Sequence, residues 1–225
     1  MLKRWLIGAA LFVGACQFHT TYTYQTASDG AADQLTAASD LHTSGATISG
    51  THVAVSLSSH WQVDEYNGLV IAENVATPDR MVMYLFVPPN DLLPADDEAS
   101  NGNRAFSLLQ RAIRLPDRIG YDVAVSLPQH ASYEGCAMAY YLLSGSDGMN
   151  SLVLAIQVPG ADLPVVLNAS LPKEYASVMR GRLVELLGSV TINDVALPRE
   201  IFDHLPDPLL FPDPQADYAV VSSQR

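Results

Sequence analysis

Short runs of alternating or continuous apolar residues dominate the chain from Thr51 to Ile192. Alternation is typical of a half-buried β-strand, and a short apolar run bounded by Gly, Pro, Asn or Asp is typical of a buried one. Turn signals such as Asn67-Gly68 and Pro88-Pro89 close several of these runs. We therefore predict strands at residues 52–57, 69–72, 81–87, 122–127, 136–143, 152–158, 165–169 and 190–192.

Two further stretches have helical periodicity. Apolar residues between Ala105 and Ile113 recur at helical spacing, and Pro116 follows them. A second predicted helix begins at Pro172 and ends at Gly188, with an apolar stripe along one side. Strands, a helix, more strands and a final helix, in that order, predict an α+β fold in which helices pack on an antiparallel sheet.

The beginning of the chain has the pattern of an export signal. Lys3 and Arg4 precede an apolar stretch, which is shorter than the roughly 20 residues that span a bilayer. The quartet Val13-Gly14-Ala15-Cys16 resembles the bacterial lipobox, although valine stands where leucine is usual. We predict that residues 1–15 are a lipoprotein signal peptide and that Cys16 is lipidated. The alternatives are an ordinary signal peptide with a chance cysteine and an uncleaved anchor helix.

These features predict an extracytoplasmic protein that is lipid-anchored to a membrane. Gln17, rather than aspartate, follows Cys16, so the lipoprotein sorting pattern predicts the outer membrane if the host has one. Residues 16–50 are rich in Thr, Ala, Ser, Gly and Asp, which predicts a flexible linker. We predict a folded domain at residues 51–197 and an extended Pro/Asp-rich tail at residues 198–225.

The charge of the chain limits its partners. Its 225 residues include 12 Lys and Arg and 24 Asp and Glu, which gives a net charge of −12. Removing residues 1–15 takes away Lys3 and Arg4 and no acids, so the predicted mature chain carries −14. We expect no nucleic acid partner, because binding to phosphates needs clustered cations.

Several segments follow one another in a recognisable order. The strand from Val53 to Leu57 leads into Trp61, a hairpin is predicted over residues 133–158, and the helix from Lys173 to Leu187 runs into a strand that begins at residue 189. This order resembles the superfamily of the photosystem protein PsbP and the Mog-type Ran-binding protein, which includes bacterial DcrB-like lipoproteins. The resemblance implies an α/β/α sandwich that serves as a non-catalytic binding or assembly module, and it carries over no catalytic residue.

Catalytic candidates are weak. His52, His60 and His130 lie within the predicted domain, but no serine lies in the G-x-S-x-G elbow that exposes a hydrolase nucleophile. Cys136 lies among small and apolar residues of a predicted strand, which indicates burial rather than reactivity. We predict that the chain is not an enzyme, with an envelope hydrolase that uses His60 or His130 as the alternative.

No cofactor or metal site is predicted. The acidic segment 96–98 and the following Asn101-Gly102-Asn103 suggest a calcium loop. When Gly102 is aligned with the turn glycine of an EF-hand calcium loop, Ala99 and Leu108 occupy positions that require oxygen ligands. The segment is better interpreted as a solvated acidic loop in which Asn103 caps the following helix.

Two groups of residues are candidates for an interaction surface. Tyr140 and Tyr141 are adjacent in a predicted strand, so their side chains point to opposite faces and at most one is expected in the core on a given side. The other is a candidate surface aromatic. Four arginines lie on or just after the first predicted helix and could dock an acidic partner or simply face solvent. They are Arg104, Arg111, Arg114 and Arg118.

The sequence therefore predicts a membrane-anchored module that binds a protein partner in the envelope or a small ligand. An envelope hydrolase and a purely structural envelope component are the alternatives. A histidine bonded to both a serine and a carboxylate would favour the enzyme. A shallow patch lined by aromatic or arginine side chains would favour the binding module.

Overall fold

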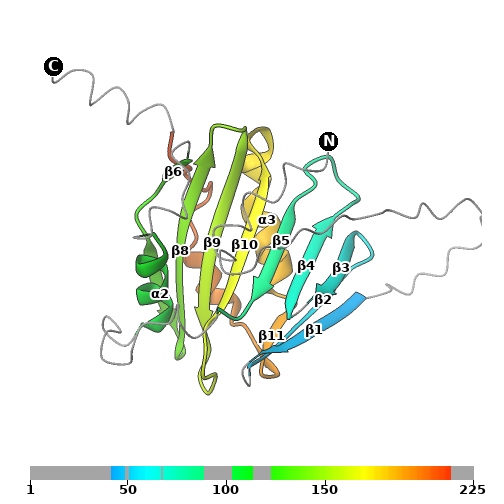
Figure 1. Cartoon of the computed structure of the whole chain (residues 1–225), viewed down its shortest axis with the longest axis vertical. Coiled ribbons are helices and arrows are strands. Elements are labelled where there is room, and N and C mark those ends of the chain that lie inside the picture. The colour runs from blue at the N-terminus through cyan, green and yellow to red at the C-terminus, as the bar shows by residue number, and fades with distance from the viewer. Residues whose placement is uncertain (1–41, 49–50, 67, 89–102, 114–122, 214–225) are drawn as a thin grey trace, which may run out of the picture.

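The structure is a computed structural model that describes residues 42–48, 51–66, 68–88, 103–113 and 123–213 (Figure 1). The described part is mostly antiparallel β-sheet with few helices. Its helices are α2 (Arg104–Ile113), α3 (Ala176–Leu187) and the short 3-10 helices η6 (Lys173–Tyr175) and η7 (Arg199–His204).

Within the described residues, eight strands form one large sheet in the order β3-β4-β5-β10-β9-β8-β6, and β7 also pairs with β8. All of these pairings are antiparallel. Gly148, with φ of 85°, forms the tight turn between β8 and β9, a conformation that glycine adopts without strain. The strands are β3 (Trp61–Tyr66), β4 (Leu69–Asn74), β5 (Val82–Phe86), β6 (Val123–Val125), β7 (Gln129–Tyr133), β8 (Cys136–Gly145), β9 (Met149–Gln157) and β10 (Val165–Pro172).

A second sheet has the order β1-β2-β11-β12. It consists of β1 (His42–Ile48), β2 (Thr51–Leu57), β11 (Val190–Ile192) and β12 (Val195–Ala196). Alternate residues of β2 are buried, as its apolar–polar pattern requires. This small sheet therefore contributes one face to the core and leaves the other face outside.

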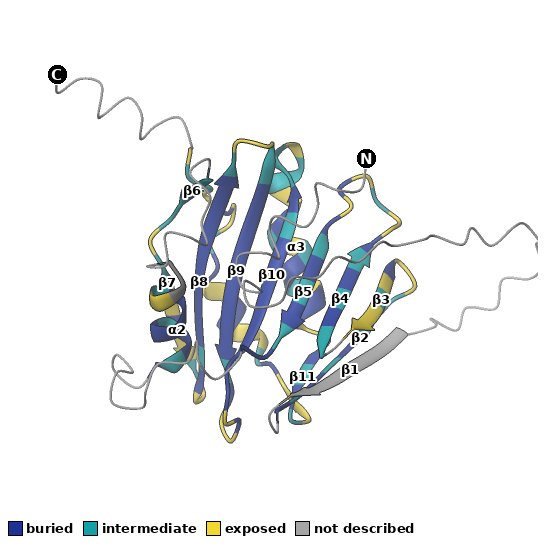
Figure 2. Ribbon diagram, in the orientation of Figure 1, coloured by how far each residue is buried: buried dark blue, intermediate teal, exposed yellow. Residues whose placement is uncertain are grey.

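The core lies on both faces of the large sheet. On one face, Phe202 of η7 and Leu183 of α3 belong to a cluster that also contains residues of β2. On the other face, Leu108 and Leu109 of α2 pack with Tyr141 of β8. Figure 1 shows α2 beside β8, and α3 behind β10 and β5. Figure 2 shows the consequence, since β8, β9 and β10 are buried almost throughout whereas β3 is largely exposed.

The predicted strands at the centre of the sheet and both predicted helices are present. Four strands were not predicted: β1 and β12 of the small sheet, and β3 and β7 of the large sheet. β3 has only one buried residue, Trp61, and β7 reads Gln-His-Ala-Ser-Tyr. Neither of these edge segments has the apolar alternation by which a strand is recognised from sequence.

Two predicted boundaries are wrong. β1 lies inside the stretch predicted to be a linker at residues 16–50. Residues 198–213, predicted to be part of an extended tail, instead pack on the core: Ile201, Phe202, Leu205 and Leu209 are buried. Ile201 and Phe202 lie in the 3-10 helix η7, and Leu205 and Leu209 follow it, despite the prolines and aspartates around them. The predicted signal peptide and the remainder of the predicted linker and tail lie outside the described residues.

The predicted α/β/α sandwich is too simple a description. α2 packs mainly on β8 and β9, so it covers only part of its face of the large sheet. The opposite layer contains the small sheet and η7 as well as α3. No helix in the described residues has the length and apolar character needed to cross a membrane.

Candidate functional site

A surface groove lies where the edge of the large sheet meets the C-terminal segment. Its volume is about 400 Å³, within the range of ~300–1,000 Å³ that is usual for ligand pockets. We call it the edge groove. It is lined by Ser126, Leu127, Gln129, Tyr140, Leu142, Pro206 and Leu210.

The floor and one wall of the edge groove come from paired strands. Gln129 of β7 is directly opposite Tyr140 of β8, so their side chains lie next to each other on the same face. Ser126 fixes the link between β6 and β7: its N–H donates to the carbonyl of Leu142, and its Oγ accepts the Leu142 N–H, each at 2.9 Å. Leu127, the next residue, is 80% exposed.

The other wall comes from the chain after η7. Buried Leu205 and Leu209 fix this segment to the core. Arg180 also joins α3 to this segment. Its Nε donates a hydrogen bond to the carbonyl of Leu205 at 3.1 Å, and its guanidinium pairs with the carboxylate of Asp207 at 3.6 Å. Leu210 then remains 74% exposed at the edge of the groove. In Figure 1 the red end of the described chain lies beside β6.

None of the described residues that line the edge groove has a charged side chain, although the protein as a whole is strongly acidic. Its polar side chains are neutral: a serine, a glutamine and a tyrosine. Burial raises the pKa of Tyr140, so its phenol stays protonated at neutral pH. The groove therefore offers an apolar surface with a few neutral hydrogen-bonding groups, which suits binding by contact and offers no group poised for catalysis.

The structure places Tyr140 and Tyr141 on opposite faces of the sheet, as predicted, but both are buried. Tyr141 lies in the cluster under α2, and Tyr140 lies in the cluster on the other face. The expectation that one of them would be a surface aromatic is therefore wrong. Tyr140 nevertheless reaches the edge groove, where it forms part of the floor.

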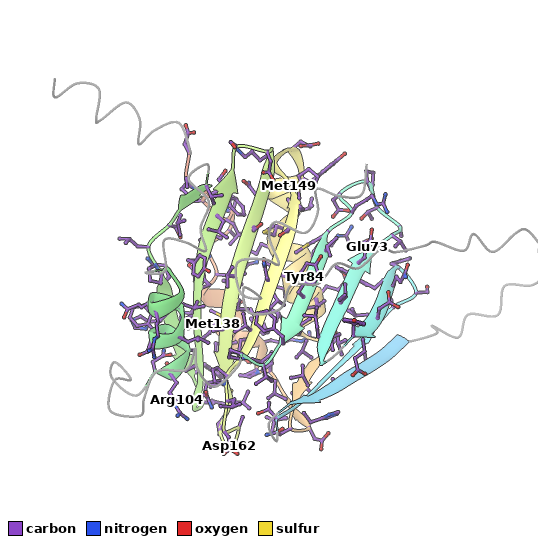
Figure 3. The ribbon with its side chains drawn as sticks, in the orientation of Figure 1. Glu73, Tyr84, Arg104, Met138, Met149 and Asp162 are labelled. Carbon is purple, nitrogen blue, oxygen red and sulfur yellow. The ribbon has the colours of Figure 1, made fainter. Side chains whose placement is uncertain are left out.

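The four arginines do not form one described surface. Arg104 begins α2, and one of its guanidinium nitrogens donates to the carbonyl of Asp162 at 3.1 Å; both residues are labelled in Figure 3. Arg111 is exposed in the last turn of α2. Arg114 and Arg118 lie outside the described residues, so the predicted arginine surface stays a prediction.

The histidine candidates do not form a hydrolase site in the described part of the chain. His130 is exposed, and its ring lies 4.7 Å from the ring of Phe106, measured between centroids. His60 is exposed in the turn before β3. No hydrogen bond between described residues joins either imidazole to a serine or a carboxylate, and the described residues contain no cluster of His, Cys, Asp and Glu that could hold a metal ion.

Cys136 is buried and free, as the sequence predicted. Burial, with a smaller contribution from the charge of Glu134, raises the pKa of its thiol. A buried thiol with a raised pKa is a poor nucleophile, because the thiolate is the reactive form. Cys16, the predicted lipidation site, lies outside the described residues.

Sequence reasoning missed most of the edge groove. Of its lining residues, only Tyr140 was a candidate. Leu127 is a single apolar residue before Pro128, and it has no periodic pattern to mark it. The one local signal at Leu210 is the apolar run Leu209-Leu210-Phe211, which is unusual in a segment otherwise rich in proline and aspartate.

No protein-family model matches the sequence, and the comparison with curated proteins finds no match. Among solved structures, the chain is similar to cyanobacterial PsbP (CyanoP) from Synechocystis sp. PCC 6803, with 13% identity, a TM-score of 0.41, and coverage of 72% of this chain and 98% of that chain. It is also similar to the Ran-binding protein Mog1p from Saccharomyces cerevisiae, with 10% identity, a TM-score of 0.40, and coverage of 68% and 96%. A Mog1 mutant gives 10% identity and a TM-score of 0.39 over 72% of this chain and 99% of that chain. At this level of similarity, the family and the function of this chain stay proposals.

Proposed function

We propose that this chain is a non-catalytic binding module that is held to the outer side of a membrane by a lipid on Cys16. The edge groove carries the binding part of this proposal. Two leucines that are mostly exposed flank a groove with an uncharged lining, and exposed apolar surface of this kind marks sites of interaction. The membrane part rests on the sequence before Gln17 alone.

The domain itself is proposed to be of the PsbP and Mog type. The support is the order of segments along the chain, from the strand ending at Leu57 and the tryptophan at position 61 to the helix followed by β11. This proposal concerns the fold, and fold alone does not specify a partner. The binding function is therefore argued from the groove.

Lipid attachment is tested by cell fractionation and by metabolic labelling with an alkyne analogue of palmitate. We expect the wild-type chain to be labelled and to sediment with membranes, and the Cys16→Ser variant to be unlabelled and released. The matched control is Cys136→Ala, which removes the other cysteine and should stay labelled and membrane-bound. A Cys16→Ser variant that remains in the membrane would contradict the anchor.

Binding is tested in intact cells with a photo-reactive amino acid placed in turn at three exposed positions, Leu127, Val178 and Val195. A discrete crosslinked complex at any of them, absent without light, supports a binding module. Absence of a complex at all three positions, with the protein present at normal levels, overturns the proposed function.

A further inference from the structure

The charge around the edge groove differs from the charge inside it. The segment 199–213 supplies Pro206 and Leu210 to the groove and contains four acids and one arginine. Asp203, Asp207 and Asp213 of this segment are exposed, and Asp207 pairs with Arg180 at 3.6 Å. We call this net-acidic segment the acidic rim; it adjoins a groove lining that is neutral, in a chain whose net charge is already −12.

This combination distinguishes between three classes of occupant. A second copy of the chain would bring one acidic rim against another, and like charges placed together at an interface are unfavourable. An anionic lipid surface would meet the same repulsion. A basic partner is attracted instead, because its cations pair with the rim while its apolar side chains enter the groove.

The shape of the edge groove favours a peptide segment. Its wall at Leu127 belongs to the link between β6 and β7, at the edge of the large sheet, and a sheet edge is a surface on which extended peptides bind. Gln129 and Tyr140 are cross-strand partners that both line the groove, and their side-chain amide and hydroxyl are groups that hydrogen-bond a peptide backbone. Leu127 and Leu210 lie in position to contact its apolar side chains.

We propose that the edge groove binds an extended, apolar segment of a partner protein that is flanked by basic residues. This inference rests on the proposed function and names the chemistry of the partner. In such an interface the two leucines and Tyr140 supply most of the binding energy, and the rim aspartates supply long-range attraction and specificity.

The test uses defined peptides and the chain from position 16 onward, with Cys16→Ser to avoid the lipid. Two synthetic peptides share the apolar core Leu-Pro-Val-Leu and differ in their flanks, with two lysines or two glutamates on each side. Binding is measured by fluorescence anisotropy, and the binding surface by backbone amide shifts. We expect the lysine peptide to bind, to shift the amides of Leu127, Gln129 and Leu210, and to bind more weakly as salt is raised.

Variants locate the binding energy. Leu127→Ser and Leu210→Ser change exposed residues and should leave folding intact, and together they should raise the dissociation constant of the lysine peptide roughly tenfold or more. Val195→Ser, which also replaces an exposed apolar residue, is the matched control and should leave the constant unchanged. Asp203→Asn, which changes an exposed aspartate outside the Arg180–Asp207 pair, should weaken binding at low salt and have little effect at high salt.

Several outcomes overturn the proposal. Three concern the peptides: equal binding of the glutamate and lysine peptides, no binding of either, or an unchanged affinity in the double leucine variant. Two concern other occupants: a dimer in analytical ultracentrifugation that the leucine variants convert to monomer, or preferential binding of phosphatidylglycerol vesicles. The photo-crosslinking experiment distinguishes failure of the edge-groove proposal from failure of the proposed function. If complexes form at Val178 or Val195 and persist in the double leucine variant, the chain is still a binding module, but the edge groove is not its binding site.

Discussion

Arg182 of α3 donates from Nε to the Oδ2 of Asp79 at 3.4 Å and so joins the helix to the loop between β4 and β5. Asp79 is buried, and it also accepts a hydrogen bond from the hydroxyl of Thr77. The same arginine pairs with Glu185 at 3.5 Å, and Glu185 in turn accepts the indole N–H of Trp61 at 3.4 Å. One cation therefore compensates a buried carboxylate and holds α3 against the β3 side of the sheet.

Replacing Arg182 by alanine is expected to destabilise the protein. The change leaves the carboxylate of Asp79 buried without a cation, and an uncompensated buried group costs about 1–3 kcal/mol. Urea unfolding followed by circular dichroism measures the difference in free energy of unfolding. Arg80→Ala is the control, since Arg80 pairs with Glu73 at 3.0 Å on the surface and such pairs contribute about 0–1 kcal/mol. Equal effects of the two substitutions would show that the pair with Asp79 has no special role.

Phe202→Ala is expected to be among the more damaging single substitutions. Phe202 is buried in the main core although it follows Pro198, where the sequence predicts an extended tail. Truncating a buried phenylalanine to alanine typically costs about 3–5 kcal/mol. Leu210→Ala, in the same segment but mostly exposed, should change stability by less than about 0.5 kcal/mol. If the Phe202→Ala protein were as stable as the Leu210→Ala protein, the packing of this segment on the core would be contradicted.

The centre of the fold could be predicted from local sequence, and the groove could not. β8, β9 and β10 are buried on both faces, so they read as nearly continuous apolar runs. α2 has an apolar stripe that ends at Ile113. Such patterns depend only on neighbouring residues. The edge groove is formed by side chains that are distant in the chain, and nothing near Leu127 indicates that Leu210 lines the same groove.

The two adjacent tyrosines show the same limit. The two-residue period of a strand correctly predicts that Tyr140 and Tyr141 face opposite sides. Whether each side is covered depends on elements elsewhere in the chain. α2 covers Tyr141, and the main core, to which residues of the C-terminal segment belong, surrounds Tyr140 except where it reaches the edge groove. Long-range packing, and not the local pattern, therefore decides which aromatic residues are available at the surface.

Cys136 is expected to react slowly with thiol reagents in the folded protein. In a Cys16→Ser background it is the only thiol, and burial raises its pKa, so little thiolate is present at pH 8. Absorbance with a disulfide reagent should show reaction many times slower than for a cysteine peptide, and full reactivity in urea. Rapid reaction of the native protein, at the rate of the peptide, would contradict the burial of this thiol.

Tyr141 is expected to make the protein sensitive to alkaline pH. Burial raises the pKa of its phenol above the value of about 10 in an unfolded chain. A raised pKa means that the stabilisation is complete below pH 10 and is lost as pH rises further, by about 1.4 kcal/mol per pH unit for one group. Tyr141→Phe should therefore leave the free energy of unfolding nearly unchanged at pH 7 and reduce its decline between pH 10 and 11. Tyr66→Phe, at an exposed position of β3, should keep the full decline. Urea unfolding at each pH measures both, and identical pH profiles for the two variants would exclude Tyr141 as a source of the alkaline sensitivity.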